Sequence, residues 1–141
     1  MRSVVHSARG VDAPRRLRRA GLRPTRQRVA LAAILFGSGD RHVTAELLHE
    51  EAVQAGERVS LATVYNTLHQ FKRAGLLREI AIGGQRAYFD TNTSNHNHYF
   101  IEGDGKLMDI PGDTIRVDGL PEPPEDLKIS HIDVVVRLVP R

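Results

Sequence analysis

Cysteine is absent from the 141-residue chain, and so is tryptophan. Without thiols the chain can form no disulfide, no cysteine zinc site and no cysteine nucleophile. Aromatic residues make up only 5% of the chain, although 40% of its residues are hydrophobic. So few large side chains give a thin core if the chain forms two small domains, and a core shared by two copies would relieve that shortage.

Long apolar runs are also missing. No segment approaches the roughly 18 to 20 apolar residues that a membrane span needs, so we expect no membrane partner. The N-terminal segment lacks the apolar core of a secretory signal, and we therefore expect a cytoplasmic protein. No Ser-His-Asp order, glycine-rich phosphate loop or paired-carboxylate motif stands out, so we expect neither an enzyme nor a small-molecule substrate.

Positive charge is concentrated at one end of the chain. Residues 1–28 contain nine Arg and one acid, a net charge of +8, whereas residues 29–90 carry −1 and residues 91–141 carry −4. A basic end favours a polyanion such as nucleic acid as a partner. We interpret residues 1–12 as a basic, disordered tail, because the helical pattern begins only at residue 13.

Four helices are predicted between residues 13 and 73. The first is short and Arg-rich and ends at Gly21, and the other three follow the capping residues Thr25, Thr44 and Ser60. In the second helix the apolar spacing predicts a buried face of Val29, Ala32, Ala33 and Phe36. In the fourth helix it predicts a buried stripe of Leu61, Val64, Leu68 and Phe71, with Thr63, Asn66, Thr67, Gln70 and Arg73 on the other side.

Strand patterns follow the helices. Two runs, 77–82 and 85–90, are joined by Gly83-Gly84, which indicates a hairpin. Helices followed by a hairpin are typical of a winged helix. Beyond a polar segment, strands are expected at 98–102, 106–110 and 128–138, and the last is so apolar that a second copy of the chain is expected to cover it.

The expected fold class is therefore α+β, with an N-terminal winged-helix DNA-binding domain and a small α/β dimerisation domain. The predicted boundaries are the tail at 1–12, the DNA-binding domain at 13–90, a hinge at 91–95 and the dimerisation and regulatory domain at 96–141. The fourth helix would read the major groove of double-stranded DNA. Its outer side offers groups that pair with base edges, and Lys72 and Arg73 at its end suit phosphates.

Histidines and carboxylates suggest a metal site. His96 and His98 form an H-x-H pair that points to one side of a strand, and His42, Asp90 and Asp109 could complete a set of three nitrogens and two carboxylates. That set suits Fe(II), Mn(II), Zn(II) or Co(II), and the sequence does not choose among them. Three other histidines, His6, His49 and His69, have no evident partners and are expected at the surface.

The chain resembles the Fur superfamily of metal-responsive regulators in AGLRPTRQR (20–28), RHVTAELL (41–48), VSLATVYNTLHQFKRAGLL (59–77), GGQRAYFD (83–90) and NHNHYF (95–100). Within it, SLATVYNTL, YFDTNTSNH and DVVVRL resemble the iron response regulator (Irr) branch. The resemblance implies a homodimeric repressor of iron-linked genes that binds operator DNA. Its regulatory site would be formed by His42, Asp90, His96, His98 and Asp109 and would hold iron, manganese or zinc.

Other implications of the resemblance concern DNA and haem. Tyr65 matches the family's base-contacting tyrosine, and Asn66 replaces a frequent Arg, which implies a different operator. The full set of DNA contacts that we expect is Arg19, Arg23, Arg26, Ser60, Ala62, Thr63, Tyr65, Asn66 and Arg73. In Irr proteins a run of three successive histidines is linked to haem binding. The resemblance therefore implies haem bound by His96 or His98 as an alternative effector. A second family site corresponds to Asn95, Asn97 and His131, where two asparagines are poor ligands.

Two alternative functions stay open at this point. Asp90 and Asp109 also fit a peroxide sensor of the same superfamily, which uses Asp among its ligands. A metal-storage or metal-delivery protein without specific DNA binding would use the same cluster.

Overall fold

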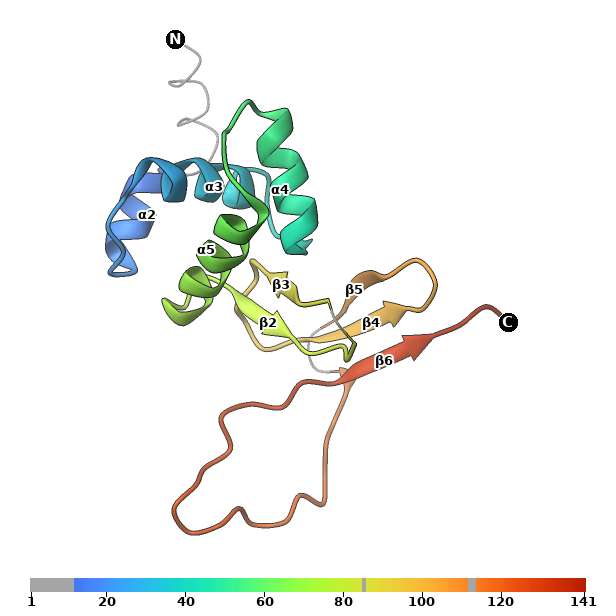
Figure 1. The fold of residues 1–141 in the computed structure, drawn as a ribbon. Helices are drawn as coiled ribbons and strands as arrows, with labels where there is room; N and C mark the ends of the chain where they lie inside the picture. The colour runs from blue at the N-terminus through green and yellow to red at the C-terminus, as the bar shows by residue number, and fades with distance from the viewer. Residues whose placement is uncertain (1–11, 85, 112–113) are drawn as a thin grey trace. The chain divides into compact units, whose positions relative to one another are not determined.

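The computed structural model describes residues 12–84, 86–111 and 114–141, and Figure 1 shows its helices and strands. The chain divides into two units, Met1–Thr93 and Ser94–Arg141. The first holds α2 to α5 with one three-stranded sheet, and the second holds another three-stranded sheet, so the α+β fold class is confirmed. The predicted tail lies outside the described residues except for Asp12, and the predicted hinge stays a prediction. None of the described helices is long and apolar enough to cross a membrane.

Each helix of the first unit begins after a side chain that accepts a backbone N–H. The helices are α2 (Ala13–Arg19), α3 (Arg26–Phe36), α4 (Ala45–Gln54) and α5 (Leu61–Arg73). Thr25, Thr44 and Ser60 cap the last three helices, as predicted, and Asp12 caps α2. These oxygens satisfy amide groups that a helix start leaves without an intrahelical partner.

The core of the first unit is built from small and aliphatic side chains, with Phe36, Phe71 and Phe89 as its largest members. Three predicted positions are wrong. In α3 the buried residues are Leu31, Ala32, Leu35 and Phe36, whereas Ala33 is exposed. In α5, Leu61 in the first turn is 42% exposed, and Thr67 is buried because its hydroxyl donates a hydrogen bond of 2.8 Å back to the Thr63 carbonyl. The buried face of α3 is shifted toward Leu31 and Leu35, whereas in α5 the predicted positions Val64, Leu68 and Phe71 are buried.

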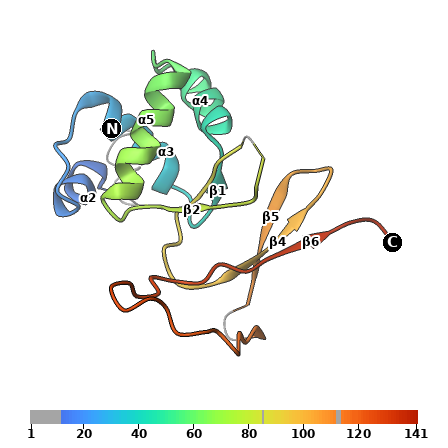
Figure 2. The ribbon, with the colours of Figure 1, turned by 60° about the horizontal axis from the view of Figure 1, so that its bottom comes forward.

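The sheet of the first unit contains the expected hairpin and one additional strand. β2 (Arg78–Ile80) and β3 (Tyr88–Asp90) are antiparallel, and the connecting Gly83 and Gly84 have φ angles of 89° and 82°. β1 (His42–Val43) pairs with the other edge of β3, which gives the order β1-β3-β2. β1 was not predicted, because a strand of two residues is too short to show an alternation of apolar and polar side chains. Figure 2 shows β1 and β2 together with the helices α2 to α5 of this unit.

The second unit is a sheet of order β5-β4-β6. β4 (Asn97–Ile101) and β5 (Lys106–Ile110) form an antiparallel hairpin, and β6 (Val135–Leu138) is parallel to β4. From residue 114 to β6 the chain runs as a wide open loop in Figure 1. The predicted strand 128–138 is therefore too long, because the ladder with β4 begins at Val135, which lies opposite His98.

Candidate metal centre and nucleic-acid interface

His42 and Asp90 form the first group of metal-ligating side chains, in the first unit. They are direct partners in the β1–β3 ladder, and His42 Nε2 lies 3.2 Å from Asp90 Oδ2. The Asp90 side chain is only 2% exposed, and its Oδ1 accepts a 2.9 Å hydrogen bond from the Asn92 amide. A carboxylate buried this deeply requires partners for both oxygens. The group therefore presents one imidazole nitrogen and one fixed carboxylate.

Backbone pairing next to this group holds it in register. The Arg41 amide donates to Thr91 Oγ1 at 2.8 Å, and the Thr91 amide donates to the Arg41 carbonyl at 3.0 Å. Arg41 also reaches α4 through an ion pair of 2.6 Å with Glu51. These contacts extend the short β1–β3 ladder beyond His42 and Asp90. β1 has only two residues, but these contacts give it enough support to position the His42 side chain.

His96, His98 and Asp109 form the second group, in the second unit. His98 is the ladder partner of Asp109 and is 3% exposed. Its Nε2 lies 3.4 Å from Asp109 Oδ1, and His96 Nε2 lies 3.2 Å from the same oxygen. The two imidazole rings have centroids 4.4 Å apart. Two nitrogens and a carboxylate oxygen thus converge on one point.

The other ring nitrogen of His96 makes a hydrogen bond that determines where the proton of the neutral ring lies. His96 Nδ1 lies 2.7 Å from the Ser94 carbonyl, which can only accept, so Nδ1 carries the proton. In the neutral ring, Nε2 then turns a lone pair toward the Asp109 carboxylate. Two acceptors face each other stably only when a cation or a second proton lies between them. A backbone carbonyl on the opposite ring nitrogen is also the usual support of a metal-bound histidine.

The exposure of the histidines outside the two ligand groups differs in part from the prediction. His49 and His69 are partly buried rather than at the surface, with His49 Nε2 3.0 Å from the Val59 carbonyl. His6 lies outside the described residues. His131 is exposed, and its Nε2 lies 3.3 Å from Asp133 Oδ2. At the position of the second family site, which the sequence did not favour, the Asn97 side-chain oxygen accepts a hydrogen bond from the Val134 amide.

The residues predicted to contact DNA lie at the end of α2, in the loop before α3 and its first residue Arg26, and on α5 with its cap Ser60. Most of them are exposed, namely Arg19, Arg23, Arg26, Ser60, Ala62, Tyr65, Asn66 and Arg73, and Thr63 is partly exposed. Ser60 Oγ is occupied by the cap, because it accepts the Thr63 amide at 3.1 Å. α2 ends on Arg16, Arg18 and Arg19, with no acid in its first turn.

A polar hollow of about 470 Å³ lies between α5 and the start of α3. It is lined by Arg23, Thr25, Gln27, Arg28, Thr63, Asn66, Thr67 and Gln70. Arg28 was not among the predicted contacts, and it joins the two walls of the hollow. Its Nε and Nη2 donate to Gln70 Oε1 at 3.2 Å each, and its Nη1 donates to the Arg23 carbonyl at 2.9 Å. The basic run 15–28 indicated charge at this place, but the partner on α5 is 42 residues away.

Comparisons with known proteins agree on one family. The model of the ferric uptake regulator family matches residues 19–136. The peroxide-responsive repressor PerR of Staphylococcus epidermidis is 34% identical over 116 residues, which are 82% of this chain and 77% of that protein. PerR of Staphylococcus aureus is also 34% identical over 116 residues, 82% of this chain and 78% of that protein.

Solved structures of similar proteins cover nearly the whole chain. The ferric uptake regulator of Pseudomonas aeruginosa with manganese has a TM-score of 0.72 and 26% identity, covering 93% of this chain and 99% of that one. The Vibrio cholerae ferric uptake regulator has a TM-score of 0.73 and 24% identity, covering 91% of this chain and 99% of that one. The second likeness supports the fold alone.

Proposed function

Because the chain belongs to the ferric uptake regulator family and is a transcriptional regulator, we propose that it is a repressor whose operator affinity is set by one divalent metal ion. Its five ligands would be His42, Asp90, His96, His98 and Asp109. The observation that carries this proposal is the pair of ligand groups, one in each unit, each held by β-ladder pairing. An ion bound by both groups would fix the angle between the DNA-binding unit and the dimerising unit.

The donor set fits a first-row divalent ion. Three imidazoles and two carboxylates, without a thiolate, suit iron, manganese or zinc. The similar regulator of Pseudomonas aeruginosa is described with manganese. When bound, the ion would supply positive charge beside His96 Nε2 and the Asp109 carboxylate. The side chain of His98 is only 4% exposed, which favours a small ion over a macrocycle such as haem at that residue.

Operator DNA would be read by α5. We propose direct base contacts from Thr63, Tyr65 and Asn66, because a recognition helix presents such groups to the major groove. The basic residues that flank it would bind phosphates and set the register of the protein on the duplex. The remaining proposed contacts are Arg19, Arg23, Arg26, Ser60, Ala62 and Arg73.

A homodimer would cover apolar residues that one copy leaves exposed. In the second unit these are Met108, Val117, Leu120, Leu127, Ile129, Ile132 and Val139, each at least 40% exposed. Among the described residues of that unit only His98 and Ile110 are buried. Because members of this family form dimers, we propose that a second copy packs on this unit and pairs two winged helices for successive major grooves.

A second candidate is peroxide sensing. The two PerR relatives are named for that response, and the ligand set here contains Asp90 and Asp109 rather than longer acidic side chains. We expect a peroxide sensor to gain one oxygen atom on His42 or His96 after exposure to Fe(II) and hydrogen peroxide, which peptide mass spectrometry would detect. An unmodified protein that still releases DNA only on iron depletion would favour iron or haem sensing of the Irr type.

Operator binding titrated with Mn(II), Fe(II) and haem in turn tests the proposal. The probe is a duplex selected from random sequences by the metal-loaded protein, and a scrambled duplex is the control. We expect one of the metals to change operator affinity, and the double variant His96→Ala/His98→Ala to lose that response while keeping its fold. The absence of any specific shift with metal-free, metal-loaded and haem-loaded protein would favour a metal-storage protein instead.

A further inference from the structure

The imidazole of His69 occupies a place that neither the metal groups nor the hollow explains. His69 lies on α5 one helical turn after Tyr65, and its buried Nε2 has no hydrogen-bond partner among the described residues. Burying a polar nitrogen without a partner is unfavourable, and an aliphatic side chain would fill the same space without that cost. The imidazole therefore requires a compensating contact.

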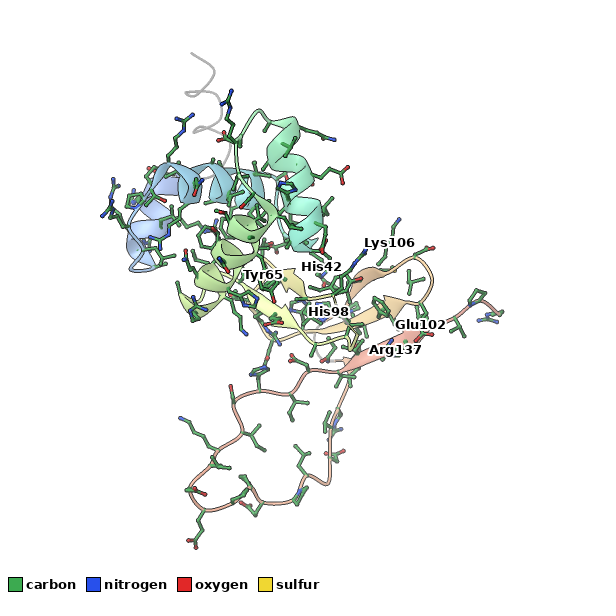
Figure 3. The ribbon with its side chains drawn as sticks, in the orientation of Figure 1. His42, Tyr65, His98, Glu102, Lys106 and Arg137 are labelled. Atoms are coloured by element: carbon green, nitrogen blue, oxygen red, sulfur yellow. The ribbon has the colours of Figure 1, made fainter. Side chains whose placement is uncertain are left out.

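That contact is with two aromatic rings. The His69 ring meets Tyr65 edge-to-face, with centroids 4.5 Å apart and an interplanar angle of 64°. It also meets Phe89 edge-to-face, with centroids 5.3 Å apart and an angle of 86°. Phe89 is fully buried in β3, whereas Tyr65 is 46% exposed on α5, where Figure 3 labels it. His69 thus connects a fixed ring in the core to a ring at the surface.

We propose that His69 is a positioning residue for DNA recognition, which holds the Tyr65 ring ready for the operator by packing it against an imidazole anchored on Phe89. The proposal rests on the proposed function, in which Tyr65 contacts the operator. An exposed tyrosine loses rotamer freedom when it binds, and a ring that is already ordered loses less. The four-residue spacing makes this possible, because residues i and i+4 lie on the same side of a helix.

The test compares two replacements in the full-length protein. His69→Leu fills the space without a ring, and His69→Phe restores an aromatic edge. Affinities for the selected operator and for a random duplex are measured at one salt concentration, and ¹³C-labelled tyrosine reports the Tyr65 ring signals. We expect His69→Leu to weaken operator binding by about three- to tenfold, with no change on random DNA and with Tyr65 signals shifted toward those of free tyrosine.

Two controls separate packing from general damage. Val53→Ala, at an exposed position of α4, should change neither affinity nor the Tyr65 signals. His69→Phe should keep both within about twofold of the unchanged protein. If His69→Phe weakens binding as much as His69→Leu, aromatic packing is not the cause and the proposal is wrong. Should His69→Leu fail to fold, His69→Met removes the ring in the same way.

Combining His69→Leu with Tyr65→Ala distinguishes this proposal from the function on which it rests. We expect the effect of His69→Leu to disappear once Tyr65 is alanine. If His69→Leu weakens binding by the same factor in both backgrounds, His69 acts independently of Tyr65 and positioning is refuted. If Tyr65→Ala alone leaves operator affinity unchanged, the proposed DNA contact of Tyr65 is itself wrong, and the role of His69 in recognition fails with it.

Discussion

Arg28 should stabilise the packing of α5 against the start of α3, and the structure allows the size of that effect to be estimated. A hydrogen bond with a charged donor contributes about 1.5 to 3 kcal/mol when sheltered. The two contacts to Gln70 share one oxygen at 3.2 Å and lie at a partly exposed place, so we count them as one bond of about 1 kcal/mol. The bond to the Arg23 carbonyl adds about 1 kcal/mol on the same reasoning.

Arg28→Met keeps the aliphatic stem and removes all three donors, so it should lower the free energy of unfolding by about 2 kcal/mol. Gln70→Met should cost about 1 kcal/mol, and the double variant about 2 rather than 3 kcal/mol, a coupling of about 1 kcal/mol. Denaturant unfolding followed by far-ultraviolet circular dichroism reports this, because the described helices all belong to the first unit. Strictly additive costs would show that the Arg28–Gln70 contact contributes nothing.

Three further effects follow from single contacts. Ser60→Ala removes the Oγ that accepts the Thr63 amide at 3.1 Å and caps α5. Thermal unfolding should show that the variant is less stable by about 1 kcal/mol. An unchanged unfolding midpoint would argue against this role of Ser60. Asp90→Asn keeps the side-chain shape but removes the negative charge beside His42. Calorimetric titration should show that the variant binds Mn(II) about tenfold or more weakly. An unchanged Mn(II) affinity would show that Asp90 is not a ligand. Ile132→Glu places a negative charge among the exposed apolar residues of the second unit. Sedimentation equilibrium should show that the variant dimerises about tenfold more weakly. An unchanged dimer affinity would place the interface elsewhere.

Local chemistry made much of the fold predictable. The caps Thr25, Thr44 and Ser60 were predictable because each accepts a hydrogen bond from the amide three residues further along the chain. Gly83-Gly84 and the alternating runs around it likewise specified a hairpin without reference to the rest of the chain. The hairpin β4–β5 follows the same rule, and the strand Lys106–Ile110 was predicted at its observed bounds.

Features that depend on distant partners were not predictable in the same way. β1 exists because His42 and Val43 meet the edge of β3, and β6 is short because its ladder with β4 begins only at Val135. The burial of Thr67 depends on a hydroxyl that turns back to its own helix, which apolar periodicity does not detect. The neighbours of His69 come partly from β3, so its surroundings were also hidden from the sequence.

The candidate ligands were predictable as residue types but not as two ladder-held groups. H-x-H on a strand indicated that His96 and His98 point to one side, and the structure shows Asp109 meeting both of them. The support from Ser94 and Asn92 required coordinates, because a backbone carbonyl or amide carries no sequence signature. Arg28 was missed as a structural residue for the same reason, since its partner Gln70 lies on another helix.

We propose above that one ion is bound by ligands from both units. Calorimetric titration of the metal-free, full-length protein with Mn(II), compared with His42→Ala and with His98→Ala, tests it most directly. We expect the unchanged protein to bind one ion tightly per chain, and we expect each single variant to lose that same ion. Full affinity in either variant, or two ions lost separately by the two variants, would contradict it.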